Sequence, residues 1–268
     1  EMLTSLGILP PWLDWYSDDL TDRSLAREEK TRAKLRNDLA TLRSYDRAAL
    51  DEGGQLSYDV LEYFLSIQAD GERFAHHDYP LNQLFGIQNG FPTFMATQHG
   101  VSSASDAKSY VARLGKAPLM VDQVMEGLRA REAAAILPPT FVVEKVLAEM
   151  RGFTAAPARQ NILYTSFAEK LGKLPAGTLD EGERDALLAQ AETAISGQVY
   201  PAYGKFIAYY DTLLAKTTGN HGVWALPDGD GYYKMQIDFW TSEGALAAHQ
   251  IHTIGLALDR RLRRKRNT

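Results

Sequence analysis

Residues 180–216 read DEGERDALLAQAETAISGQVYPAYGKFIAYYDTLLAK, and this run decides the fold class. Apolar side chains recur along it at three- and four-residue spacings, which is the period of one face of an α-helix. The apolar set is Leu187, Leu188, Ala191, Ile195, Val199, Phe206, Ile207, Tyr210, Leu213 and Leu214. Pro201 lies inside the run and has no backbone N–H to donate. We therefore expect a kink or a helix boundary near Gly197–Tyr200.

The first third of the chain has the same helical character. Ser24–Leu50 places leucines at helical spacing among charged residues, which is typical of an amphipathic helix that packs by one face. The pair Gly53-Gly54 predicts the end of that helix. Ser57 is the expected N-cap of a second helix, which fades near Phe74–His76.

The middle of the chain alternates between helical segments and proline breaks. Residues 78–100 contain prolines and glycines among many apolar side chains, so we expect an irregular segment folded against the body. Ser105 is the expected cap of a short helix, and Pro118 suits the first turn of the next. Pro138-Pro139 then separates that helix from another over Thr140–Met150.

Beyond residue 216, a loop around residues 219–231 leads to two more expected helices, Tyr232–Trp240 and Ala245–Leu258. No stretch shows the strict alternation of a multi-stranded sheet. The sequence therefore predicts an all-α fold, with a single helical domain over residues 1–256 and a basic tail over residues 257–268.

Charge and composition narrow the classes of partner. The net charge is −5, and six basic residues lie between Arg260 and Arg266, which leaves −11 on the rest of the chain. The body would repel nucleic acid, and only the tail offers a nucleic-acid contact. The chain has no cysteine, no apolar run long enough to span a membrane, and no signal peptide over Glu1–Pro10.

Histidines are the first candidates for a metal site. His249 and His252 are three residues apart and can share a helix face, but a catalytic zinc normally takes three protein ligands. No histidine is followed directly by glutamate, so the helical His-Glu-x-x-His arrangement is absent. The favoured interpretation is one packed and one solvated imidazole. The adjacent pair His76-His77 is weaker, because neighbouring helical positions point about 100° apart.

Two further patterns have ordinary structural interpretations. Ser105 and Lys108 match the Ser-x-x-Lys spacing of serine enzymes, but the companion motifs are missing, so a capping serine and an exposed lysine are favoured. Pro227–Gly231 has the acidic and glycine residues of a calcium loop without its further ligands, and it predicts a turn. No phosphate-binding loop or Gly-x-Ser-x-Gly occurs. The residues alone give no complete active site.

Several stretches together resemble a known bacterial family, the domain of unknown function eight-eight-five. The stretches that carry the resemblance are Leu20–Ser24, Tyr79–Pro92, Ser109–Leu114, Pro138–Val143, Val199–Tyr203, Gly222–Gly229 with Tyr232-Tyr233, and Ile251–Leu256. The most specific of them is the block that begins Gly-Val-Trp-Ala-Leu-Pro-Asp-Gly.

This resemblance implies a helical fold similar to the N-terminal half of gluzincin-type zinc peptidases. In such proteins the zinc-binding residues lie in the second half, so zinc is expected only for a full-length relative, and no catalytic or metal residue is assigned here. The first half forms one wall of the substrate cleft, which makes Tyr232, Tyr233 and His252 the candidate cleft or interface residues. Many members are secreted lipoproteins, which implies a secreted or periplasmic location.

Two departures from the family pattern favour a cut or non-catalytic relative. Ala247–Gln250 replaces an acidic helix start, and the resemblance stops after Leu256. The leading hypothesis is a truncated or non-catalytic relative of a zinc-dependent peptidase-like hydrolase that provides one wall of a peptide cleft. The alternative is a helical binding or scaffold protein for a peptide or partner chain. The expected partners are a peptide, the C-terminal half of the same fold, or a second copy.

The second-copy hypothesis rests on apolar surface that a missing half would cover. We expect self-association through residues near Tyr209, Tyr210, Trp240 and Ile251, with the tail solvated at the rim or disordered.

Overall fold

The structure is a computed structural model that describes residues 17–217, 219–241 and 246–266. Within these residues it contains helices and no strand, so the all-α prediction is confirmed. None of the helices in the described part of the chain has the length and apolar character needed to cross a bilayer.

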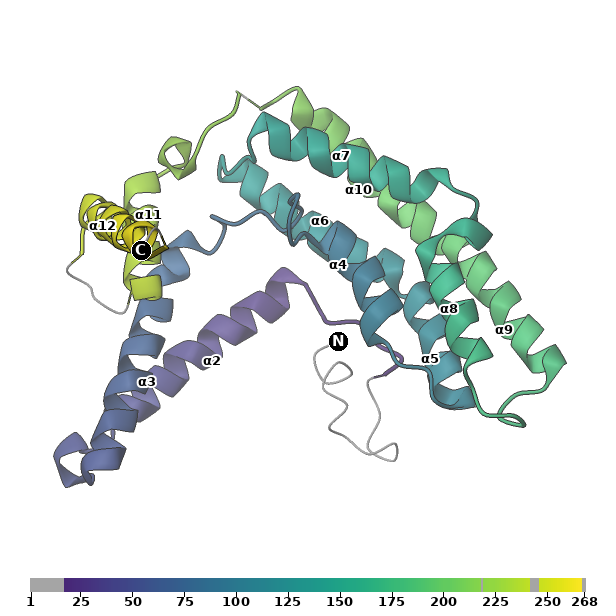
Figure 1. The fold of residues 1–268 in the computed structure, drawn as a ribbon, viewed down its shortest axis with the longest axis horizontal. Helices are drawn as coiled ribbons and strands as arrows, with labels where there is room; N and C mark the ends of the chain where they lie inside the picture. The colour runs from purple at the N-terminus through teal and green to yellow at the C-terminus, as the bar shows by residue number, and fades with distance from the viewer. Residues whose placement is uncertain (1–16, 218, 242–245, 267–268) are drawn as a thin grey trace. The chain divides into compact units, whose positions relative to one another are not determined.

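The helices are numbered as in Figure 1. Their bounds are α2 Leu25–Arg43, α3 Glu52–Asp70, α4 Ile87–Thr93, α5 Ala104–Gly115, α6 Ala117–Ala133, α7 Thr140–Ala155, α8 Ile162–Gly172, α9 Glu181–Ala194, α10 Tyr200–Leu214, α11 Gly229–Thr241 and α12 Ala248–Arg266. Short 3₁₀ turns lie at Arg47–Ala49, Gly71–Phe74, Ala158–Gln160 and Val223–Ala225, and π-helical turns lie at Phe94–Gln98 and Ile195–Val199.

The chain divides into two compact units. Unit 1 comprises Tyr79–Asn220 together with the described residues up to Arg27, and unit 2 comprises Glu28–Asp78 and the described residues from His221 onward. The single domain expected over residues 1–256 stays a prediction, because two compact units can belong to one domain. The basic segment from residue 257 continues α12 to Arg266, so helical structure extends into the expected tail.

Unit 1 is built from α4 to α10 around one apolar core (Figure 1). Helix α10 packs against α6 and α7, while α9 packs against α5 and α8. Tyr110 stacks on Phe167 with ring centroids 4.4 Å apart, and Tyr203 contacts Phe153 at 4.7 Å. Tyr110, Phe167 and Tyr203 are fully buried and Phe153 is partly buried against them, so α5, α7, α8 and α10 form one continuous core.

The long run over residues 180–216 forms α9, a π-helical turn and α10 in succession. The boundary predicted near Gly197–Tyr200 is present as this turn, in which the N–H of Tyr200 donates to the carbonyl of Ile195. The N-terminus of α9 has a reciprocal cap between Asp180 and Glu183. The acidic first turn and this cap explain why the helix begins at Glu181.

The segment from residue 78 to 100 is more ordered than the sequence predicts. Leu81, Phe91 and Phe94 are buried as expected, whereas Leu84 and Phe85 are exposed. The segment contains α4 and a π-helical turn although Pro92 interrupts the pattern. Pro92 cannot donate to the carbonyl of Gln88, four residues earlier. The hydroxyl of Tyr203 donates to that carbonyl instead, over 2.8 Å, which compensates for the proline.

Three predicted helix ends are wrong by a few residues. Helix α2 ends at Arg43 rather than Leu50, and the glycine pair at 53–54 lies in the first turn of α3. Asp51, not Ser57, caps α3, because its carboxylate accepts from the N–H of Gly54 over 2.7 Å. Likewise Ser103, not Ser105, caps α5. In each case the observed helix end or cap lies two to seven residues before the one predicted.

In unit 2, α3 packs against α11. The hydroxyl of Tyr63 on α3 donates to the carbonyl of Asp238 on α11 over 2.8 Å. Helix α11 therefore has a fixed position beside α3.

Candidate functional site

The chain turns tightly over Gly222–Gly231, a segment that ends in the first turn of α11 and that we call the glycine knuckle. A Cβ on Gly229 would lie 2.0 Å from the carbonyl oxygen of Val223, and a Cβ on Gly222 would lie 2.1 Å from the ring of Trp224. Asp228 adopts a φ of 48°, in the left-handed region. The predicted turn is present at Pro227-Asp228, and α11 begins immediately after it. The close approach of Gly229 to the backbone of Val223 leaves no room for a Cβ, so this position requires glycine.

Tyr232, the first aromatic residue of α11, belongs to a cluster of three rings. Its ring centroid lies 5.6 Å from that of Phe74 and 5.1 Å from that of His77. His77 Nε2 donates to the carbonyl of Pro227 over 2.7 Å, which ties the cluster to the knuckle. Burial raises the pKa of the Tyr232 phenol. The ring therefore supports the start of α11 from inside unit 2.

A groove of about 500 Å³ lies between the end of α3 and α11. It is lined by Ile67, Asp70, Arg73, Gly231, Lys234, Met235 and Asp238. The four α11 residues occupy positions i, i+3, i+4 and i+7, so they share a helix face. Met235 packs against Gly71, whose missing Cβ would stand 3.5 Å from the methionine sulfur.

Charged side chains of both signs surround this apolar floor. Lys234 Nζ lies 3.0 Å from a carboxylate oxygen of Asp238, and Arg73 lies 3.7 Å from the carboxylate of Asp228. Asp70 adds a third, exposed carboxylate. The α3–α11 groove thus combines an apolar floor with paired charges at its rim.

Exposed aromatic rings lie on the same two helices. Tyr233 is 49% exposed and Trp240 is 77% exposed. The ring of Phe239 lies 5.2 Å from that of Trp240 and 6.4 Å from that of Phe64 on α3. We call Phe64, Phe239 and Trp240 the aromatic patch. Exposed rings that touch one another are typical of binding surfaces.

The histidine candidates lie on α12. His249 and His252 are about one helical turn apart and both are exposed, so the expectation of one packed imidazole is wrong. Across the described residues, no three His, Asp or Glu side chains gather closely enough to hold a metal ion. Two exposed imidazoles without a third ligand do not fit a zinc site.

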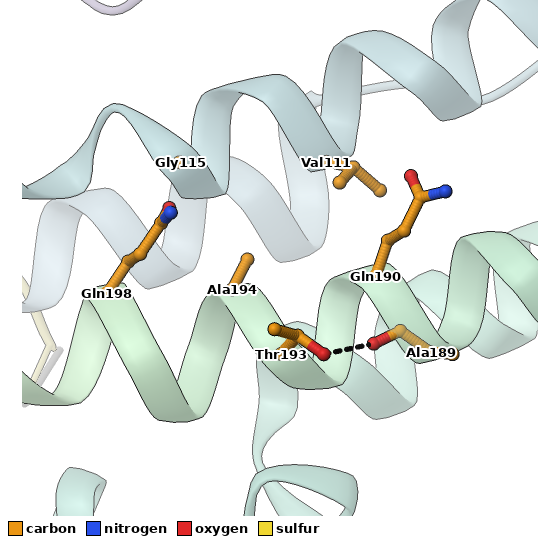
Figure 2. Close-up of a pocket in the computed structure, with 7 residues that line it drawn as sticks. All are labelled: Val111, Gly115, Ala189, Gln190, Thr193, Ala194 and Gln198. Carbon is orange, nitrogen blue, oxygen red and sulfur yellow. Dashed lines mark hydrogen bonds between the residues drawn. The ribbon is translucent and has the colours of Figure 1, made fainter.

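A second groove, of about 410 Å³, lies between α5 and α9 in unit 1 (Figure 2). It is lined by Val111, Gly115, Ala189, Gln190, Thr193, Ala194 and Gln198. Gly115 leaves room for Gln198, whose amide oxygen would be 3.1 Å from a Cβ at that position. The lining has no ionisable group, so this groove offers fewer polar contacts than the α3–α11 groove.

A buried basic cluster in unit 1 was not predicted from the sequence. Arg113 is fully buried, donates to Nδ1 of His99 over 2.7 Å, and donates to the carbonyl of Asp19. Lys170 donates to the carbonyls of Met95 and His99 at 2.6 and 2.7 Å. The cluster closes the C-terminal end of the π-helical turn at Phe94–Gln98.

Burial sets the electrostatics of this cluster. It lowers the pKa of His99 to about 4, with the charge of Arg113 as the second cause, and it lowers the pKa of Lys170 to about 8. His99 bonds through Nε2 to the carbonyl of Asp106 and accepts from Arg113 at Nδ1, and Lys170 donates to two backbone carbonyls. The arrangement is therefore structural. The one signal in the sequence is Arg113 itself, which falls beside Tyr110 and Leu114 on the apolar face of α5.

The Ser-x-x-Lys pattern has the ordinary interpretation predicted for its lysine. Ser105 and Lys108 are both exposed on α5. The capping role belongs to Ser103.

Tyr210 was expected near an interface. It is buried on α10, and its hydroxyl donates to the carbonyl of Leu81 over 3.0 Å. Tyr210 therefore belongs to the core, and the expectation that it takes part in an interface is wrong.

These features define an all-α protein. Its two most distinctive features are the glycine knuckle and the groove between α3 and α11. The chain belongs to the family of bacterial proteins of unknown function DUF885, whose model matches residues 1–267. The match extends to residue 267, so the expectation that the resemblance stops after Leu256 is wrong. Among curated proteins, no match was found.

A solved structure shares the fold. It is the crystal structure of a protein from Colwellia psychrerythraea that is described as a lipoprotein, with 25% sequence identity and a TM-score of 0.78. The similarity covers 91% of this chain and 43% of the Colwellia protein. The chain thus spans less than half the length of this relative.

Proposed function

We propose that this chain provides the substrate-binding wall of a zinc-dependent, peptidase-like hydrolase, and that the α3–α11 groove receives an extended peptide. The groove's apolar floor and paired rim charges carry the proposal. Met235 offers a site for an apolar side chain, while Asp70 and Lys234 offer opposite charges to a peptide's own charged groups.

The three candidate residues take different parts in this proposal. Tyr233, half-exposed on α11, extends the binding surface beside the groove. Tyr232 positions α11 through its contacts with Phe74 and His77. His252 lies on α12, and its assignment to the cleft stays a prediction.

The catalytic zinc is proposed only for a longer relative of this chain. Metal analysis of the purified, untagged chain tests this part: we expect less than stoichiometric zinc. One tightly held zinc per chain that is lost in His249→Ala or His252→Ala would contradict it. By analogy with the Colwellia protein, we also propose a secreted or periplasmic location.

Peptide binding is tested by tryptophan fluorescence, because Trp224 and Trp240 lie in the same unit as the groove. The probe is a blocked heptapeptide with a central leucine and one lysine. We expect saturable binding that Met235→Glu weakens at least tenfold, because the new carboxylate occupies the apolar floor.

The matched control is Gln190→Ala, an exposed change in the α5–α9 groove of unit 1 (Figure 2). It should leave the affinity unchanged. Binding that responds to Gln190→Ala and not to Met235→Glu would reject the α3–α11 groove as the peptide site.

A second candidate function is a helical scaffold for a partner chain, and the exposed aromatic patch favours it. In that case Trp240→Ser should abolish capture of the partner while Met235→Glu has little effect. The two functions are therefore distinguished by which of these two residues matters.

A further inference from the structure

Helix α12 carries an exposed apolar stripe along its length. Ile251, Ile254, Leu258 and Leu262 follow one another at spacings of three, four and four, so they fall within an arc of about 80° on the helix. The last three of these side chains are 50%, 52% and 61% exposed. Every side chain from His252 to Arg263 is exposed, so unit 2 leaves this stripe uncovered.

The same helix carries a dense positive charge. Six basic residues lie between Arg260 and Arg266, and the one acidic residue of α12, Asp259, is already paired with Arg263 at 2.8 Å. Arg260 and Arg263 fall on the side opposite the stripe, and Arg261 falls at its edge. Low overall hydrophobicity, an apolar stripe and a basic polar face together are the signature of an interfacial helix.

We propose that α12 binds the surface of a bilayer rich in anionic phospholipid. The helix lies parallel to the surface, with the Ile251–Leu262 stripe in the boundary between headgroups and acyl chains. The arginines then meet lipid phosphates, to which guanidinium groups donate paired hydrogen bonds. Outside residues 260–266 the chain carries a net charge of −11, so α12 is the element that an anionic surface attracts.

Two other occupants fit the helix less well. Nucleic acid would satisfy the positive charge, but it leaves four aliphatic side chains without an apolar partner. A second α12 would cover the stripe, but it brings six more basic residues and no free carboxylate on the helix. An anionic bilayer supplies both the apolar layer and the negative charge.

The test is flotation of the full chain with vesicles of two compositions. One is phosphatidylcholine alone, and the other is phosphatidylcholine with about 30 mol% phosphatidylglycerol, an anionic share that gives a strong surface potential. We expect the protein to float with the anionic vesicles only, and less at high salt. Replacing Arg260, Arg261 and Arg263 by glutamine should weaken partitioning about a hundredfold, since each basic charge contributes about fivefold.

Two neighbouring leucines give a matched pair of variants. Leu258 lies on the stripe, and Leu256, which is 45% exposed, lies off it. Leu258→Glu should reduce vesicle binding at least tenfold, while Leu256→Glu, with the same change in charge, should reduce it only about fivefold. Circular dichroism of both variants checks that each chain remains folded.

Three results would overturn the proposal. They are no flotation with anionic vesicles, equal losses in the two leucine variants, or lipid-free self-association that Leu258→Glu abolishes. The last would assign the stripe to a second copy. Binding to a DNA duplex that withstands Leu258→Glu, with no vesicle binding, would assign the basic face to nucleic acid.

Discussion

The guanidinium of Arg113 donates to Nδ1 of His99 across 2.7 Å inside unit 1. This contact fixes the tautomer of the histidine, because a ring nitrogen that accepts carries no proton. The proton of the neutral ring is therefore on Nε2, which faces the carbonyl of Asp106 at 3.2 Å. A protonated ring would place two donors against each other at Nδ1.

The first prediction concerns pH. The pKa of His99 is lowered from 6.5 to about 4 in the folded chain, chiefly by burial. The unfolded chain therefore binds a proton first as the pH falls, so stability is fully present above about pH 6.5 and is lost progressively toward pH 4. We expect the free energy of unfolding to fall by about 2 kcal/mol between pH 7 and pH 5.

Urea unfolding followed by circular dichroism at the two pH values measures this change. His99→Gln keeps an acceptor for Arg113 and cannot titrate, so its stability should vary much less with pH. His252→Gln, at an exposed position, should keep the full pH dependence of the parent chain. If His99→Gln retains that dependence as well, another group is responsible.

The second prediction concerns Lys170, whose ammonium donates to two carbonyls at the end of the π-helical turn. Lys170→Met keeps most of the side-chain volume but leaves the carbonyls of Met95 and His99 without that donor. We expect a loss of about 2 kcal/mol in the free energy of unfolding.

Lys173→Met is the control for this prediction, since Lys173 is 71% exposed and pairs with Glu169 on the same surface. It should change stability by less than about 0.5 kcal/mol. If urea unfolding gives equal losses for the two variants, the buried hydrogen bonds of Lys170 do not add measurably to the free energy of unfolding.

The third prediction concerns the glycine knuckle. Gly229→Ala places a methyl group where the carbonyl oxygen of Val223 stands, so the knuckle must open, at a cost of about 1–3 kcal/mol. Gly53→Ala, in α3 of the same unit, meets its nearest atom at an ordinary 3.8 Å. It should be neutral or stabilising by up to about 1 kcal/mol.

Thermal unfolding monitored by tryptophan fluorescence measures both glycine variants, because Trp224 lies in the knuckle. A Gly229→Ala chain as stable as the parent would mean that the knuckle adapts easily.

The fourth prediction concerns self-association. Of the residues expected to mediate it, Trp240 is exposed in the aromatic patch, whereas Tyr210 is buried. We therefore expect Trp240→Ser to weaken concentration-dependent association, while Tyr210→Phe alters stability without altering association. Light scattering over a dilution series measures this. A monomer at every concentration would reject self-association altogether.

The helical fold was predictable because its signal is local. The spacing of apolar residues over 180–216 and the proline breaks at Pro118 and Pro138 depend only on near neighbours in the chain. Helix ends were harder to predict, since several residues compete to cap each one. Asp51 and Ser103 prevail over Ser57 and Ser105 through carboxylate and hydroxyl contacts that spacing alone does not rank.

The candidate site was predicted only in part, because it depends on contacts between distant segments. Tyr233 is exposed on α11, and its assignment to the cleft stays a prediction. The groove itself joins Ile67 on α3 to Met235 on α11, and no sequence pattern links the two. The basic cluster escaped prediction for the same reason: Lys170 lies 71 positions after His99, whose carbonyl it reaches.

The π-helical turn at Ile195–Val199 also affects the direction in which the buried side chains of α9 and α10 face. At about 100° per residue, the buried set of α9, which includes Leu187 and Ala191, is offset by nearly one residue from that of α10, which includes Phe206 and Leu213. A π-helical turn accommodates one extra residue, so it cancels the offset and keeps both sets facing one core. The turn therefore aligns the buried sides of α9 and α10.

Removing Gly197 should convert the π-helical turn to an α-helical turn and leave the buried side of α10 facing the core. Removing Gly204 should instead rotate the rest of α10 away from its neighbours. Thermal unfolding of the two deletions would reveal the difference. We therefore expect the chain to tolerate the loss of one residue at Gly197, so that the combined length of α9 and α10 can change while their buried sides still face the core.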